Sequence, residues 1–236
     1  MVKDQNNRGI VDPILSVLDN YPSSRNTPYP GDRAVVEVIK NQIPEYLNNL
    51  FGTLLHEGSV GKGNWAAIPW VASMDENITT TVSKGVYLVF LFCADGSGVY
   101  MTMAQGTGGI EKHVNKKINS IRRDKILSVT DPPSELFMEK GTLPNGSLKA
   151  GNNVRAKAYE NSVIMWKYYS RDDLSSMEND DPIIDVFHGL SSFYLGVKDI
   201  IDEDVQDNQN EVIKRACEKY IIHCNSSTWL ADEKYK

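Results

Sequence analysis

The chain has 236 residues and a mass of 26.4 kDa, with 41% hydrophobic and 24% charged residues. This is the composition of a globular protein, so it excludes a chain that is disordered or of low complexity throughout. The length suits one large domain or a domain with an appendage. The net charge of −6, taken as a whole, argues against nucleic-acid binding, which usually requires a basic surface.

The sequence contains no sign of a membrane, a secretion signal or a metal centre. No run approaches the roughly 18–20 apolar residues that cross a bilayer, and residues 1–9 are polar. Three cysteines without a secretory signal fit a reducing compartment, so we expect a cytoplasmic protein with free thiols. The four histidines are scattered singly, without the spacing of a zinc site. We therefore expect no metal and no cofactor.

The N-terminal part has the pattern of short helices. Residues 10–20 have an amphipathic spacing, with Asp12 and the proline after it as the expected start of a helix. Three prolines predict a loop over residues 21–31. A second helix follows with Asp32 as its expected N-cap, and Pro44 is expected to separate it from a shorter one.

The centre of the chain has the pattern of a sheet. Residues 65–72, 85–93 and 98–104 are rich in β-branched and aromatic residues and are bounded by Gly, Asp and Ser. The sequence Asp-Gly-Ser-Gly at 95–98 indicates a hairpin between the last two strands. The sequence thus predicts an α+β fold, in which a central, mostly antiparallel sheet is flanked by helices and followed by a helical C-terminal part.

Both helices and strands are expected in the second half. Residues 110–127 predict an amphipathic helix with a basic outer face, and residues 180–201 predict another helix. Short strands are expected at 135–138 and 162–169. A last helix is expected to end near residue 223, after an acidic break.

Motifs of catalysis are weak. Residues 58–63 contain glycines and a lysine, but they lack the Lys-Ser/Thr ending of a phosphate-binding loop, and a strand rather than a helix is expected after them. Asp131, Glu139 and Lys140 form a faint metal-dependent nuclease pattern, for which a solvated loop is the better interpretation. We therefore expect a protein that is not an enzyme, with a nuclease subunit and a protein-interaction scaffold as alternatives.

Four short motifs in the centre carry a resemblance to a known family. They are Gly-Lys-Gly-Asn-Trp at 61–65, Ile-Pro-Trp at 68–70, Gly-Val-Tyr at 85–87 and Gln-Gly at 105–106. In this order they resemble the N-terminal, modified-DNA-recognition domain of McrB-type restriction systems.

The resemblance is strong over residues 55–110. It is weaker but collinear from residue 14 to residue 201, including Tyr-Pro-Ser-Ser-Arg at 21–25. It places a DNA-recognition domain at residues 1–205. Residues 206–236 are then a C-terminal helix or linker towards an effector domain or partner.

The resemblance implies a module that binds duplex DNA and rotates a modified cytosine, such as 5-methylcytosine, into an aromatic pocket. Trp70 and Tyr87 would be the walls of this pocket and Leu91 its floor. Lys62 and Asn64 would contact the DNA from their loop, although the best-understood member has an aromatic residue where Lys62 stands. The family also implies a motor or nuclease partner in phage defence, with catalysis outside this chain.

The strand pattern is compatible with the pocket, but it also allows a simpler interpretation. Tyr87, Val89 and Leu91 share one face of a strand, because side chains alternate between the two faces. Stacking on an aromatic ring contributes about 1–3 kcal/mol per base. Aromatic residues in such strands are nevertheless usually core residues, so both roles stay open for Trp70, Tyr87 and Leu91.

Charge is distributed unevenly along the chain. The segment from Asp172 to Glu211 holds twelve acidic residues and one basic residue, which leaves +5 for the remainder. Residues 110–126 alone carry +4. From this helix we expect contacts to DNA phosphates by Lys112, Lys116, Lys117 and Arg122. The acidic segment should lie away from the face that holds Trp70 and Tyr87.

Overall fold

The computed structural model describes residues 8–108, 112–129 and 138–198, and within 112–129 the side chains of residues 119–128. The expected last helix, the 206–236 segment and Asp131 lie outside the described residues, as do the side chains of Lys112, Lys116 and Lys117.

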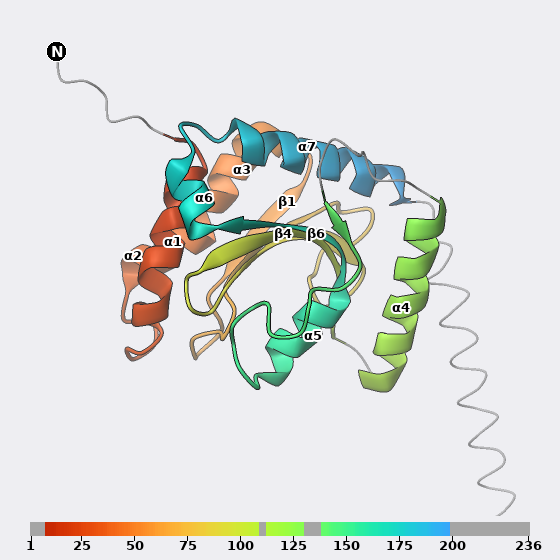
Figure 1. The fold of residues 1–236 in the computed structure, drawn as a ribbon, viewed down its shortest axis with the longest axis horizontal. Coiled ribbons are helices and arrows are strands. Elements are labelled where there is room, and N and C mark those ends of the chain that lie inside the picture. The colour runs from red at the N-terminus through yellow and green to blue at the C-terminus, as the bar shows by residue number, and fades with distance from the viewer. Residues whose placement is uncertain (1–7, 109–111, 130–137, 199–236) are drawn as a thin grey trace, which may run out of the picture.

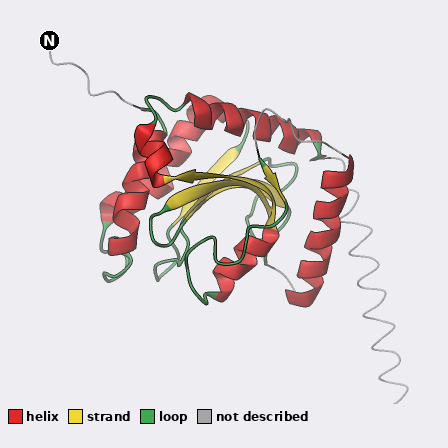
Figure 2. Cartoon of the chain, viewed as in Figure 1, coloured by secondary structure: helices red, strands yellow, loops and turns green. Residues whose placement is uncertain are grey.

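The described residues form one antiparallel sheet of six strands in the order β1-β2-β3-β4-β6-β5. The expected α+β fold with an antiparallel centre is thus confirmed (Figures 1 and 2). The strands are β1 (Leu55–Ser59), β2 (Trp70–Met74), β3 (Val86–Phe92), β4 (Gly98–Gln105), β5 (Glu139–Lys140) and β6 (Val163–Ser170).

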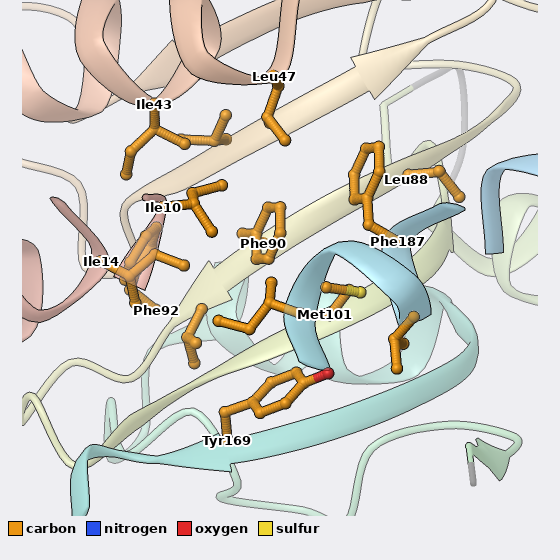
Figure 3. Packing of buried hydrophobic residues seen from close by; sticks show 14 of the residues in the cluster. Ile10, Ile14, Ile43, Leu47, Leu88, Phe90, Phe92, Met101, Tyr169 and Phe187 are labelled. Carbon is orange, nitrogen blue, oxygen red and sulfur yellow. The ribbon is translucent and has the colours of Figure 1, made fainter. Parts of the chain in front are cut away.

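One face of the sheet is covered by helices from both ends of the described chain. These are α1 (Val11–Ser24), α2 (Arg33–Glu37), the π-helical turn η1 (Val38–Gln42), α3 (Ile43–Phe51), α6 (Arg171–Ser176) and α7 (Asp181–Gly196). Leu88 and Phe90 of β3 point into this layer, where the Phe90 and Phe187 rings stack with centroids 5.9 Å apart (Figure 3). Every residue in the strand stretch 86–92 is buried.

The other face is covered by α5 (Val154–Ser162) and the segment 143–148. Helix α4 (Lys112–Val129) lies beside α5, at the right of Figure 1. Since α7 packs on the helix-covered face, its acidic Asp181 and Asp185 lie across the sheet from Trp70 and Tyr87. The expected separation from this face is thus confirmed for the described helix α7, while residues 199–211 of the acidic segment lie outside the described residues.

The N-terminal helix departs from its predicted limits at both ends. It begins at Val11, because Asp12 accepts hydrogen bonds from Arg8 instead of capping the helix. It also continues through Pro22 to Ser24, so the prediction of a loop from residue 21 was wrong. The Tyr21 side chain is buried and draws this last turn inward. The N-cap predicted at Asp32 is confirmed by bonds from the amides of Ala34 and Val35.

The first predicted strand is too early and the true edge strand was missed. Residues 65–69 are not in the ladder, and β2 begins only at Trp70. Pro69 has no N–H to donate, and the carbonyls of Ala66 and Ala67 accept hydrogen bonds from Tyr21 and Arg25. The missed strand, β1, has the weakly strand-like sequence Leu-His-Glu-Gly-Ser.

The other central elements agree with the sequence. The β3–β4 hairpin turns at Gly96, with a φ of 78°. Strand β6 and helix α7 lie where they were expected, and α4 covers most of the predicted 110–127 helix. Of the strand expected at 135–138, only Met138 is described, and β5 follows at Glu139–Lys140.

Candidate nucleic-acid interface

A cavity of about 490 Å³ lies on the face of the sheet opposite the helical layer. Three strands contribute to its wall, because Trp70 of β2 pairs with Leu91 of β3 and Tyr87 of β3 pairs with Ala104 of β4. Val89 lies between Tyr87 and Leu91 on the same face. The structure thus brings together the three residues that the sequence singled out for a pocket.

Helix α5 supplies a further wall. Asn153 caps it, accepting hydrogen bonds from the amides of Arg155 and Ala156. The α5 residues that line the cavity recur at helical spacing and so share one side of the helix: Val154, Arg155, Ala158, Tyr159 and Ser162. The remaining lining residues, from the segments after β2 and β4, are Val82, Ser83, Thr107 and Gly108.

Tyr159 is a site residue that the sequence reasoning missed. Its hydroxyl accepts a hydrogen bond from the Trp70 indole, and burial raises its pKa above the usual value. Burial raises the pKa of Tyr87 strongly as well, and the nearby Tyr159 adds to that shift. The Tyr87 hydroxyl donates to the Gln105 carbonyl at 3.4 Å. Three aromatic side chains, two of them phenols held neutral, therefore surround one space.

The Lys62–Asn64 loop is a closed turn at the Trp70 end of the sheet, since the β1 residue Ser59 pairs with Trp70. The Ala66 amide donates to the Val60 carbonyl at 2.7 Å, which closes the loop. Lys62 and Asn64 are exposed at its tip and do not line the cavity. Their side chains are free to reach a ligand outside it.

Three aromatic residues, Tyr21, Tyr29 and Trp65, support this loop. The Tyr21 hydroxyl lies within hydrogen-bonding distance of both the Val60 and Ala66 carbonyls, at 3.3 and 2.8 Å. Trp65 packs edge-on against Tyr21 and Tyr29, with centroids 5.6 and 5.4 Å away.

Two further bonds tie this support to the residues before α2. The Trp65 indole donates to the Thr27 carbonyl at 2.9 Å, and the Tyr29 hydroxyl donates to the Gly61 carbonyl at 3.1 Å. The loop is therefore preorganised, so little conformational entropy remains to be lost when it meets a ligand.

Arg122 was expected on the outer face of α4, but its side chain is buried instead. Its side chain is only 6% exposed and donates to Gln105 Oε1 at 3.3 Å. Gln105 in turn donates to the Asn119 carbonyl at 2.9 Å, and Asn119 donates to the Gly106 carbonyl. This buried network fastens α4 to the end of β4, because a buried polar group needs partners. Arg122 is thus placed to position α4 rather than to contact a ligand.

The described residues show no support for the nuclease alternative. Glu139 and Lys140 are exposed on the short strand β5, and within residues 8–108, 112–129 and 138–198 no group of three His, Cys, Asp or Glu side chains is arranged to hold a metal ion. In the same ranges, no helix has the length and apolarity needed to cross a membrane.

The fold and the cavity define an α+β domain with an aromatic pocket on one face of an antiparallel sheet. Residues 16–195 match the sequence profile of the MrcB-like N-terminal domain, and the chain belongs to this family. The predicted resemblance is thereby confirmed, and the chain contains a module related to restriction systems. The comparisons found no match among curated proteins or solved structures.

Proposed function

We propose that this chain is the DNA-reading module of a modification-dependent restriction system. It binds duplex DNA and accepts a modified cytosine, rotated out of the base stack, in the cavity beside Trp70, Tyr87 and Tyr159. The single observation that carries this proposal is the gathering of these three rings and Leu91 around one space, in a chain of this family.

The chemistry of the cavity suits a base. A flipped base must regain the stacking that it loses in the duplex, and flat apolar surfaces provide it. The cavity offers indole and phenol rings together with the aliphatic side chains of Val89 and Leu91. Because both phenols are neutral, no buried phenolate opposes the polyanionic DNA.

The surroundings suit a phosphate backbone. Lys62 and Asn64 project from the braced loop. Lys84 is exposed beside the cavity, and Arg155 is exposed within its lining. Lys112, Lys116 and Lys117 remain proposed backbone contacts on α4. Phosphate contacts would position the domain, and the cavity would read the modification. Cleavage would then depend on a motor or nuclease domain or partner.

The test is binding to fluorescein-labelled duplexes that contain cytosine, 5-methylcytosine or 5-hydroxymethylcytosine at one position. We expect the chain to prefer a modified duplex. Trp70→Ala, Tyr87→Ala and Tyr159→Ala should each reduce this preference while leaving weak, salt-sensitive binding intact. Tyr46→Ala is the matched control, since Tyr46 is a half-buried tyrosine of the helical layer. Full discrimination in all three cavity variants would show that the cavity is not the reading site.

A further inference from the structure

The cavity is larger than a methylated cytosine requires. A water molecule takes about 30 Å³ of liquid, so the roughly nine non-hydrogen atoms of 5-methylcytosine occupy at most about 270 Å³. The cavity measures about 490 Å³. Since pockets for flipped bases are normally snug, the remaining space calls for an occupant of its own.

Small side chains create this extra room. Ser83, Ala104, Gly108, Ala158 and Ser162 all line the cavity. At Gly108 a side chain is excluded, because a Cβ there would lie 2.9 Å from that of Ser83. The Gly108 amide also donates to the Ser83 carbonyl at 3.0 Å, which joins the segments after β2 and β4. The space is therefore part of the packed architecture of the site.

The lining of the cavity is of two kinds. The aromatic rings and Leu91 offer surfaces for stacking, whereas Ser83, Thr107 and Arg155 carry hydroxyl and guanidinium groups. Hydroxyl groups donate and accept hydrogen bonds, and a guanidinium has five N–H donors. Such groups suit a substituent that bears several hydroxyls, which a methyl group does not have.

We propose that the cavity takes a cytosine enlarged at its 5-position by a sugar-sized substituent that bears hydroxyl groups. The base stacks among the aromatic rings, and the substituent begins in the space left by the small side chains. By the measure used above, a glucosylated 5-hydroxymethylcytosine, with about 21 non-hydrogen atoms, takes at most about 630 Å³. Since this exceeds the 490 Å³ of the cavity, the outer part of the sugar extends to the exposed rim at Ser83 and Arg155, with Thr107 beside it. This inference rests on the proposed function, and it names the class of modified base that the site reads.

The experiment compares four otherwise identical duplexes carrying cytosine, 5-methylcytosine, 5-hydroxymethylcytosine or glucosylated 5-hydroxymethylcytosine. The full chain should bind the glucosylated duplex about tenfold more tightly than the methylated one. Binding of the methylated duplex that equals or exceeds that of the glucosylated duplex would overturn the inference but leave the proposed function standing. Equal binding of all four duplexes would refute both.

Filling the cavity provides the second arm. Ala158→Leu should weaken binding of the glucosylated duplex about tenfold and change that of the methylated duplex less than twofold. Asn161→Leu adds the same side chain to α5 at an exposed position outside the cavity lining and should change neither. Ser83→Leu fills the space from the exposed segment after β2, so it serves if Ala158→Leu does not fold. Equal weakening of both modified duplexes by a folded filling variant would overturn the inference.

Discussion

The two faces of the central sheet are packed to different degrees. On strand β3, Leu88 and Phe90 meet a continuous layer of helices, while Tyr87, Val89 and Leu91 border a cavity. The strand is buried along its whole length on both faces, so burial alone does not distinguish them. What differs is whether neighbouring side chains fill the space: α7 packs its apolar side against the sheet, whereas α5 leaves a hollow beside Tyr159.

The largest effect should appear in stability, in a pair of identical substitutions. Leu88 and Leu91 are leucines of one strand, 0% and 3% exposed, that face opposite layers. Leu88→Ala should lower the free energy of unfolding by about 3–5 kcal/mol, because it opens a new void in a filled core. Leu91→Ala should cost about 2 kcal/mol, since its side chain already borders a cavity. Urea unfolding measures both, and equal costs would show that the two faces are equally well packed.

For DNA affinity, the cavity face should matter more than the helical face, which is the reverse of the order expected for stability. Trp70→Ala and Tyr159→Ala should each weaken binding of the preferred modified duplex by roughly 5- to 150-fold, as loss of one stacking contact of about 1–3 kcal/mol implies. Conservative Leu88→Val, on the helical face, should leave the affinity unchanged. Fluorescence anisotropy at one fixed salt concentration measures all three. A loss for Leu88→Val as large as that for Trp70→Ala would mean that binding reports general stability rather than the cavity.

The sequence predicted the strands of the cavity better than the helix that completes it. Alternation along residues 85–93 placed Tyr87 and Leu91 on one face, because a strand's period is set by local geometry. Tyr159 was missed because the aromatic residues of 162–169 predict only the strand that follows it. Two signals could have identified Tyr159 as a helical residue of the site. Asn153 is a favourable N-cap, and the residues from Arg155 to Tyr159 have helical spacing.

The errors have a common physical origin in side chains that bind distant backbone. The Tyr21 and Arg25 side chains hold the carbonyls of Ala66 and Ala67, which lie more than 40 residues further along the chain. This keeps residues 65–69 out of the ladder despite their strand-like composition. In the same way Arg122 turns inward to Gln105. Local patterns do not contain such tertiary bonds, so they misplace both features.

Charged residues on the two faces should differ in their effect on the salt dependence of binding, and this difference should be smaller. Lys84→Ala, beside the cavity, should weaken binding to all duplexes alike and reduce the slope of log K against log salt by about 1. Asp181→Asn, on the exposed side of α7, should leave that slope unchanged because this helix faces away from the DNA. Titrations at several salt concentrations give the slopes. A steeper slope for Asp181→Asn would place α7 at the DNA instead.

The smallest effect should come from the support of the Lys62–Asn64 loop. Tyr29→Phe removes only the hydroxyl that donates to the Gly61 carbonyl, which lowers the free energy of unfolding by about 0.5–1.5 kcal/mol. Because the loop then samples more conformations, affinity for unmodified duplex should fall roughly two- to threefold. If Tyr29 acts by holding Lys62 in place, this loss must vanish in the Lys62→Ala background, since the contact it positions is gone.

The wild type, Tyr29→Phe, Lys62→Ala and the double variant form a double-mutant cycle. This cycle distinguishes a positioning role of Tyr29 from an effect on general stability. A purely structural role predicts that Tyr29→Phe weakens binding equally with and without Lys62, because the two changes would then act independently. Val36→Ala supplies a control, as Val36 is a half-buried residue of α2 that packs in the helical layer and should lower stability without altering affinity. The cavity face would then consist of two parts with separate tasks: a space that reads the base, and a braced loop whose position relative to Trp70 is fixed before DNA arrives.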